Sequence, residues 1–292
     1  MDYMPYICCI NDSKLMKITE VHLVTFSPTH TSKQIGEAIV CGIGCDKSVW
    51  TDLTQPVINP ISISRNALTV IVVPVYGGHV APLAAQRLVN VTSEGGPAVI
   101  VVVYGNRAYE KALVDLDALA THNGFKVIAG GTFIGEHSYC SDRYPIACGR
   151  PDSADLEYAD LFGQKIRTKM MQAVDESHLY GVDVTKIQRP TQSFFGLLRF
   201  FFQLKKLRKS GAPFPRTPKV DASACTHCGL CVSRCPNEAI VKGDECNTLA
   251  DKCIKCCACV KACPVGARSF DTPFAPLLSR YFQRPKQNRI IL

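Results

Sequence analysis

The sequence predicts an α/β protein, a parallel doubly wound sheet followed by a small α+β domain. Between residues 18 and 174, short apolar runs alternate with segments of helical periodicity. This alternation is typical of a parallel sheet with right-handed crossovers. Between residues 225 and 264, cysteines recur at a regular spacing. That second pattern indicates a separate, smaller unit built around bound metal.

Five strands are predicted, and two of them are apolar along their whole length. Residues 68–75 and 97–104 have this unbroken apolar character, which indicates strands buried on both faces. The other three are residues 21–26, 48–53 and 125–134. Helices are expected up to about residue 40, near 82–91, over 107–123 and over 154–174, with Asn123 and Gly124 ending the third.

The turn after the first strand decides between two common doubly wound sheets. One binds nicotinamide dinucleotides through a G-x-G-x-x-G turn, and the other has the flavodoxin strand order 2-1-3-4-5. No G-x-G-x-x-G follows any predicted strand. A hydroxyl-rich turn follows the first strand instead, so we predict the flavodoxin-like order.

This turn is also the first candidate cofactor site. Its hydroxyl groups precede a predicted helix, whose N-terminal amides favour anions. The predicted phosphate-binding residues are Ser27, Thr29, His30, Thr31 and Ser32. They suit a phosphate monoester such as that of FMN, although hydroxyls at this position also serve as ordinary helix N-caps.

Two further loops follow the third and fourth strands, where a ligand of such a sheet binds. Their glycines allow the backbone to approach a flat ring, and their tyrosines offer a face for stacking. The predicted contacts are Tyr76, Gly77, Gly78, Gly105, Asn106, Arg107 and Tyr109. We expect Tyr76 and Tyr109 to flank the ring, with rim tyrosines as the alternative. Arg107 is expected near N1 of the flavin unless it is simply solvated, and His137 is expected at the rim.

Two cysteine runs form the strongest motif. In each, three cysteines at C-x2-C-x2-C spacing are followed three residues later by Cys-Pro, the arrangement of ferredoxins with two [4Fe–4S] clusters. The fourth cysteine of each run then binds the other cluster. The first predicted ligand set is Cys225, Cys228, Cys231 and Cys263. The second is Cys253, Cys256, Cys259 and Cys235. Zinc is the alternative, but zinc sites use isolated pairs.

The chain resembles the fused proteins of anaerobic bacteria and archaea that join a flavodoxin-like domain to a bacterial-type 2[4Fe–4S] ferredoxin. The resemblance covers about residues 17–271 and depends on the three loops and the two cysteine runs. It implies FMN binding in the first domain and electron transfer in both. One departure is His30, which stands where flavodoxin phosphate loops usually carry glycine. It could add a cationic donor to the phosphate or weaken FMN binding.

Five segments are expected along the chain. Residues 1–16 are an N-terminal extension, expected to reflect a mis-set start, in which Cys8 and Cys9 are not expected to be ligands. Residues 17–180 form the FMN domain, 181–218 a linker, 219–271 the ferredoxin domain and 272–292 a tail. Within the linker, residues 193–209 are rich in phenylalanine and then basic. Such a helix either lies on a membrane surface or packs between the domains; packing is the favoured expectation.

Composition and charge argue against nucleic-acid-binding, membrane-spanning and secreted proteins. The formal charge is +8, but each cluster with four thiolates carries about 2 − 4 = −2, which lowers the total to roughly +4. No interleaved basic and aromatic pattern indicates nucleic-acid binding. No apolar run reaches the ~18 residues of a spanning helix, and no secretory signal is recognised. The many thiols indicate a cytoplasmic location in an anaerobe.

These features favour an electron-transfer protein that passes electrons between FMN and two [4Fe–4S] clusters. Its redox partner proteins are not indicated by the sequence. The alternative is a flavin reductase of a small organic acceptor, such as a quinone or a nitro compound, fed by its own ferredoxin domain. A docking scaffold without flavin is the third reading. No acid–base pair or nucleophile identifies a substrate.

Overall fold

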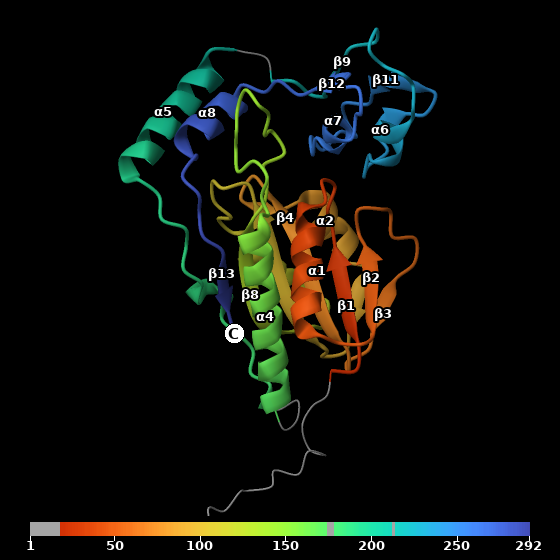
Figure 1. Cartoon of the computed structure of the whole chain (residues 1–292), viewed down its shortest axis with the longest axis vertical. Helices are drawn as coiled ribbons and strands as arrows, with labels where there is room; N and C mark the ends of the chain where they lie inside the picture. The colour runs from red at the N-terminus through yellow and green to blue at the C-terminus, as the bar shows by residue number, and fades with distance from the viewer. Residues whose placement is uncertain (1–17, 174–177, 212–213) are drawn as a thin grey trace, which may run out of the picture.

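The computed structural model describes residues 18–173, 178–211 and 214–292. The predicted N-terminal extension, with Cys8 and Cys9, lies outside these residues. The described chain forms one parallel sheet with helices on both faces and a small second domain above one edge (Figure 1).

Five parallel strands form the centre of the sheet. In spatial order they are β2 Ser48–Asp52, β1 Val21–Thr25, β4 Leu68–Tyr76, β7 Pro97–Tyr104 and β8 Lys126–Ile134. Counted along the chain, this order is 2-1-3-4-5. The predicted flavodoxin-like order is therefore confirmed.

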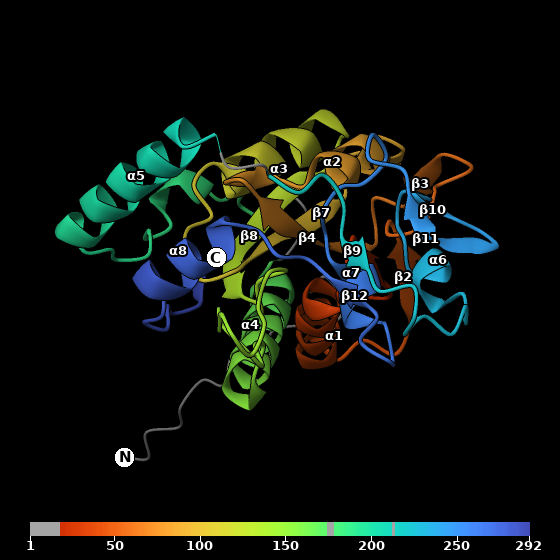
Figure 2. The same cartoon turned by 90° about the horizontal axis from the view of Figure 1, so that it is seen from above.

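The helices cover the two faces in pairs. Helices α1 Thr31–Ile43 and α4 Ser153–Gln172 lie on one face, and α2 Pro82–Leu88 and α3 Ala112–His122 lie on the other (Figures 1 and 2). The first pair is in backbone contact. A Cβ atom on Gly42 would lie 1.9 Å from the carbonyl oxygen of Asp160, so only glycine permits this approach.

Two predicted helices begin or end elsewhere. Helix α3 begins at Ala112 rather than at residue 107, because Asn106 and Glu110 have φ angles of 60° and 45°. Helix α2 ends at Leu88, and the chain continues into strand β6, Val91–Ser93, which pairs with β3, Ile61–Ile63. A short strand β5, His79–Val80, folds back on β4.

The C-terminal tail, expected as a separate segment, returns to the first domain. Strand β13, Arg289–Ile291, adds an antiparallel edge to β8. Before it, α8 Phe274–Tyr281 packs on α5 Phe194–Lys209, where the Phe200 and Phe282 rings are 4.9 Å apart. The short 3-10 helix Val184–Lys186 precedes α5.

The second domain is an internal repeat. Its short helices, α6 Leu230–Ser233 and α7 Ala258–Lys261, each begin after a residue with positive φ, Gly229 and Cys257. Two antiparallel pairs frame them: β9 Lys219–Val220 with β12 Arg268–Ser269, and β10 Ile240–Val241 with β11 Asp244–Thr248. The second pair is a hairpin, which turns at Gly243 with a φ angle of 85°. This domain lies over the carboxyl ends of the strands (Figure 1).

Candidate cofactor site

A cavity of about 530 Å³ lies at the carboxyl ends of the parallel strands. Its walls come from the loops after β1, β4, β7 and β8, as expected for a ligand site of this sheet. Two further walls come from distant parts of the chain: α5 and α8 on one side, and Ile254 and Lys255 of the second domain on the other. The cavity is therefore lined by the sheet domain, by α5 and α8, and by the second domain.

The loop after β1 is organised by Ser27. Its amide donates to Thr54 Oγ1 at 2.7 Å, and its hydroxyl oxygen accepts from the amide of Lys33 at 3.0 Å. Thr31 and Ser32 open α1, so their amides have no acceptor within the helix. The buried Ser32 hydroxyl has no partner among the described residues. Ser27, Thr29, Thr31 and Ser32 all line the cavity, and this set of donors fits a phosphate group.

His30 faces away from these donors. Its φ angle is 67°, in the left-handed region that favours glycine. Its Nε2 atom lies 2.9 Å from Nη1 of Arg234 in the second domain. Both side chains border a separate small cavity, and His30 is not among the residues that line the large one. His30 thus contacts the second domain instead of the predicted phosphate site.

Glycines in the other loops leave room for neighbouring side chains. Tyr76, Gly77, Gly78, Gly105 and Arg107 all line the cavity. A Cβ atom on Gly105 would lie 2.4 Å from Cδ2 of His137, and one on Gly78 would lie 2.2 Å from Oε2 of Glu110. Glu110 in turn pairs with Arg107, with Oε1 2.6 Å from Nη1. The charge of Arg107 is therefore partly balanced before any ligand is bound.

The structure does not bring Asn106 and Tyr109 to this cavity. Asn106 is buried, and its Nδ2 atom donates to the carbonyl oxygens of Phe282 and Arg284 at 2.5 and 3.0 Å. Its role is to hold the tail. Tyr109 is buried in the core beside Tyr104, with ring centroids 5.6 Å apart. Tyr109 was expected at the ring because it is a tyrosine in a loop after a strand, but this loop has positive φ angles at residues 106 and 110 and its tyrosine packs into the core.

Most of the loop after β8 was not predicted to belong to the site, and His137 was expected only at its rim. Glu136, His137, Ser138 and Tyr139 line the cavity. Nδ1 of His137 accepts the amide of Tyr139 at 3.0 Å. Burial, with the charges of Lys261 and Arg107, lowers the pKa of His137 to about 4, so its ring is neutral at pH 7. The preceding strand was recognised, but this loop has no motif that would have revealed its part in the site.

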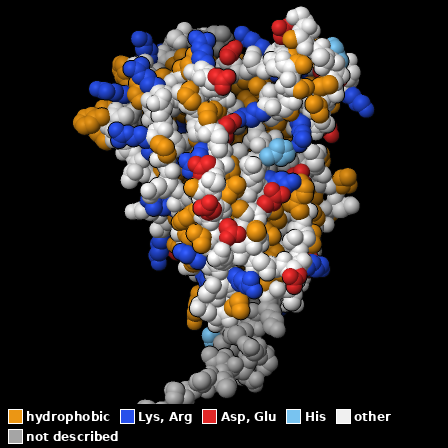
Figure 3. Space-filling view, viewed as in Figure 1, with side chains coloured by type: hydrophobic (Ala, Val, Ile, Leu, Met, Phe, Trp, Pro, Cys, Tyr) orange, Lys and Arg blue, Asp and Glu red, His pale blue; other side chains and the backbone are white. Residues whose placement is uncertain are grey.

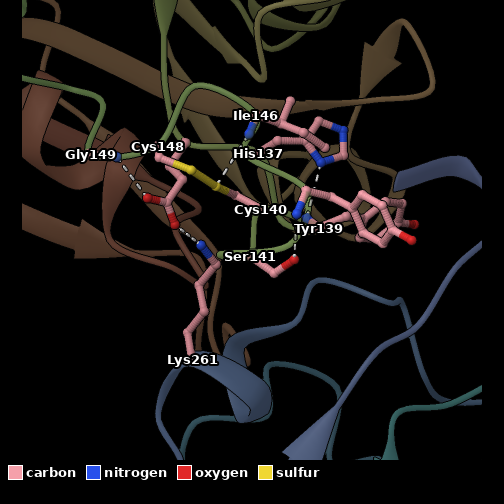
Figure 4. Close-up of a disulfide and its surroundings, with 10 residues drawn as sticks. His137, Tyr139, Cys140, Ser141, Ile146, Cys148, Gly149 and Lys261 are labelled. Carbon is pink, nitrogen blue, oxygen red and sulfur yellow. Dashed lines mark hydrogen bonds and ion pairs between the residues drawn. A yellow bond between two sulfur atoms is a disulfide. The ribbon is translucent and has the colours of Figure 1, made fainter. Parts of the chain in front are cut away.

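The same loop ties the cavity to the second domain (Figure 4). Lys261 of α7 forms an ion pair with Glu136, whose other oxygen accepts the amide of Gly149 at 2.9 Å. A disulfide joins Cys140 to Cys148 across the loop. These two are among the eight cysteines outside the cluster motif. The bond closes the segment that directly follows His137 and Tyr139.

The first predicted ligand set converges on one small cavity. Its lining includes all four thiols, those of Cys225, Cys228, Cys231 and Cys263. Cys246 lies beside them, since its sulfur, that of Cys225 and a ring nitrogen of His227 are within 4.8 Å of one another. Cys246 is outside the repeated spacing, so no sequence signal placed it there. The donor set is sulfur-rich, which fits an iron–sulfur cluster.

The second predicted set also lies together. Burial, and then the neighbouring thiols, raise the pKa of Cys256 to about 12, and the neighbours that act on it are Cys259, Cys235 and Cys253. Burial likewise raises the pKa of Cys259, to about 11. These thiolates therefore need a strong positive centre to form, which iron supplies when it binds. Cys235, the fourth cysteine of the first run, lies among the cysteines of the second run, as the predicted exchange requires.

This second set lies next to the large cavity. Burial raises the pKa of Tyr76 well above its usual value, and Cys256 and Cys257 raise it further. For Tyr139 the causes are burial and then Cys257, Cys253 and Cys256, which together raise the pKa to about 12. Both tyrosines line the cavity. Both side chains therefore lie within electrostatic range of the second set of cysteines.

The guanidinium group of Arg87 forms hydrogen bonds to both domains. Its Nη1 atom donates to the carbonyl oxygens of Leu53 and Thr54 at 2.8 and 2.6 Å, and Nη2 donates to that of Pro236 at 2.6 Å. Thr54 also accepts the amide of Ser27. Arg87 thereby links the phosphate-type loop to the residue directly after Cys235.

A comparison with models of protein families supports the assignment of the second domain. A family model described as a 4Fe-4S binding domain matches residues 218–241 and 249–269. No curated protein matches the chain. Among solved structures, a flavodoxin from the domain Archaea matches at 13% identity and a TM-score of 0.35, covering 52% of this chain and 98% of that one.

Two other solved structures match the first domain. A Fusobacterium nucleatum flavodoxin bound to flavin mononucleotide matches at 14% identity and a TM-score of 0.37, covering 52% of this chain and 98% of that one. Rubredoxin oxygen:oxidoreductase from the anaerobe Desulfovibrio gigas matches at 12% identity and a TM-score of 0.39. That match covers 55% of this chain but only 39% of that protein. The fold is assigned from the strand order of the chain and not from these matches.

The chain therefore joins a flavodoxin-like domain to a 4Fe-4S binding domain. Proteins with iron–sulfur clusters of this type carry electrons, and this defines the chain as an iron–sulfur protein of the electron-transfer class.

Proposed function

We propose that the protein transfers electrons between FMN, bound in the large cavity, and two [4Fe–4S] clusters in the second domain. The observation that carries the proposal is the shared wall. Ile254 and Lys255, which lie between Cys253 and Cys256, line the cavity. One ligand loop of the second cluster would thus touch the flavin site directly. FMN, when bound, exchanges two electrons and can pass them singly, whereas each cluster carries one.

The residues of the chain have separate roles in this proposal. Ser27, Thr29, Thr31 and Ser32 bind the phosphate with hydroxyl and amide donors. Tyr76 and Tyr139 lie between the ring and the second cluster and exclude water there. Arg107 supplies positive charge on the cavity wall. The two cysteine sets, in the crossed arrangement described above, hold the clusters.

Reconstitution with iron, sulfide and FMN under argon tests the proposal. We expect about eight iron atoms and one FMN per chain, with both cluster and flavin signals in a redox titration followed by EPR and visible absorption. In stopped-flow reduction by a one-electron protein donor, Cys253→Ala should retain FMN but reduce it much more slowly. The matched control is Cys41→Ala, since Cys41 is exposed on α1. Equal rates in the three proteins, or a purified protein without iron, would contradict the proposal.

A second candidate is the reduction of a small organic acceptor by the bound flavin. Neutral His137 on the cavity wall favours it, because Nδ1 is occupied by the amide of Tyr139 and the proton therefore resides on Nε2. Such a group can donate a hydrogen bond to an acceptor. Turnover of a quinone or nitro compound that depends on His137 would select this function. If no such compound is reduced, electron transfer between proteins is the function that remains.

A further inference from the structure

One face of α5 has no partner among the described residues. Phe194, Leu198 and Phe202 follow one another at intervals of four and form a single row along the helix. Their side chains are 72%, 59% and 68% exposed. Phe195 and Phe201 flank this row and are also exposed. The opposite side of the helix, with Leu197, Phe200 and Leu204, packs on α8, so α5 is held in place while its phenylalanine face remains uncovered.

The end of α5 is strongly basic. Lys206, Arg208 and Lys209 lie in its last turn, Lys205 directly precedes them, and all four are exposed. The sequence has no acidic residue between positions 184 and 220, and none after Asp271. In the space-filling view, hydrophobic and basic side chains gather over the upper left of the molecule, where α5 lies (Figures 1 and 3). The exposed face is therefore apolar along most of its length and cationic at its end.

We infer that α5 binds the surface of a bilayer that contains anionic phospholipids. The phenylalanine face inserts below the headgroups, and the basic last turn lies at the level of the lipid phosphates. Amphipathic helices with aromatic and basic side chains bind membranes in this way, by burial of apolar area and by attraction to anionic lipid. No helix in the described part of the chain is long and apolar enough to cross a membrane. The inferred attachment is thus to one surface.

Charge favours lipid over other occupants of this face. A second copy of the chain would bring a second cationic turn, with no acidic side chain on α5 or α8 to balance it. A protein partner would need to pair a cluster of four basic side chains. A phosphate surface presents many anionic groups at once and needs no fixed register.

Helix α5 is also part of the cavity wall, so binding to a membrane through α5 would affect the cavity. Phe201 is 54% exposed and also lines the large cavity, as do Phe200, Leu204 and Arg208 of the same helix. A protein bound through α5 would therefore hold one wall of its cavity at the membrane interface. The inference itself does not depend on which cofactor fills the cavity.

Flotation of the holoprotein with liposomes tests the inference. We expect the protein to float with phosphatidylcholine vesicles that contain phosphatidylglycerol, to float less as salt is raised, and to remain in solution with pure phosphatidylcholine. The variant Phe194→Ser/Leu198→Ser/Phe202→Ser should lower the bound fraction at least about tenfold. None of these three residues lines the cavity. Lys205→Gln/Lys209→Gln should weaken binding mainly at low salt, where the attraction to anionic lipid is least screened.

A matched control replaces three apolar residues that are exposed elsewhere: Ile58→Ser/Val114→Ser/Leu161→Ser. It should float like the unchanged protein, and circular dichroism of all variants reports whether they fold. The inference is overturned if the unchanged protein does not float with anionic vesicles at low salt, or if the control loses binding equally. It is also overturned if light scattering shows a dimer that the α5 variant dissociates, because a second copy would then cover the face.

Discussion

At the scale of single residues, a few buried polar side chains set the geometry around the cavity. Asp155, on the first turn of α4, is 2% exposed and pairs with Arg150. It also accepts from the amide of Asp152 at 3.0 Å and from Nδ2 of Asn288 at 2.7 Å. Asn288 in turn accepts the amide of Ile134 at 2.9 Å. One carboxylate thus joins a helix start, a loop and the C-terminal tail.

Asp155→Asn should lower the free energy of unfolding by roughly 3 kcal/mol, because it leaves the Arg150 charge without its buried partner. Burial would raise the pKa of Asp155, but its hydrogen bonds to Arg150, Asp152 and Asn288 hold that pKa below its usual value. The stabilisation is therefore full above about pH 4 and is lost as pH falls through the folded-state pKa. Denaturation as a function of pH measures both effects.

The control is Asp160→Asn, since the Asp160 carboxylate accepts from Gln164 on its own helix. It should cost less than about 0.5 kcal/mol. An Asp155→Asn variant with the same acid stability as the unchanged protein would show that the network contributes nothing.

Gly105 shapes the cavity because its lack of a side chain leaves room for the His137 ring. In Gly105→Ala, the new methyl group would overlap the His137 ring, so the loop after β8 must move. We expect FMN affinity to fall about tenfold or more, since shifts of this kind displace several contacts together. Fluorescence titration with FMN measures it. Gly196→Ala on α5, where a Cβ atom has space, should bind FMN normally; equal affinities would place the flavin away from this wall.

At the scale of elements, the C-terminal tail is part of the first domain. Strand β13 pairs with β8, α8 packs on α5, and Asn106 holds the segment between them. The amide of Lys286 donates to Oδ1 of Asn106 at 2.9 Å. Asn106 therefore satisfies three backbone groups of the tail. The tail in turn keeps α5 and α8 against the cavity.

Asn106→Ala should destabilise the protein by roughly 2 to 4 kcal/mol, because it leaves buried backbone groups unpaired. The loss should be local, with faster hydrogen exchange in β13 and α8 than in β1 or β4. Mass spectrometry of amide exchange resolves these segments. Exposed Asn66→Ala serves as the control. Unchanged protection of the tail would mean that β13 pairing alone holds it.

At the scale of the whole molecule, polar contacts between described residues join the domains. They include the hydrogen bond of Arg87 to Pro236, the contact of His30 with Arg234, and the ion pair of Lys261 with Glu136. All three lie around the large cavity or the second set of cysteines. The arrangement of the domains is therefore fixed where the two candidate cofactor sites meet.

Arg87→Met removes the most buried of these contacts, which costs about 3 kcal/mol for the lost charge-assisted hydrogen bonds. We expect normal iron and FMN content but slower electron transfer between clusters and flavin, measured by stopped-flow absorbance. Lys47→Met is the control, since Lys47 pairs with Glu20, 3.1 Å away, at the amino ends of β1 and β2, opposite the end that carries the cavity. An unchanged rate in Arg87→Met would show that the other contacts suffice for docking.

Local patterns account for much of this molecule. Strand order followed from unbroken apolar runs and from a hydroxyl-rich turn, since these depend on neighbouring residues. The phosphate-type loop and the glycines at residues 77, 78 and 105 were placed at the cavity by their position after strands. Both cysteine sets were grouped by spacing alone, because a cluster requires its ligands within a few ångströms.

Contacts between distant segments decided the rest. The wall made by α5, the β13 strand, and the closeness of Cys256 to Tyr76 depend on packing between parts of the chain that are separated by more than a hundred residues. Asn106 and Tyr109 turned away from the cavity because backbone angles, not residue type, set their direction. Sequence by itself determined which cofactor-type motifs exist, because each is local. Only the tertiary structure decided that they share one cavity wall, because that depends on how separate surfaces fit together.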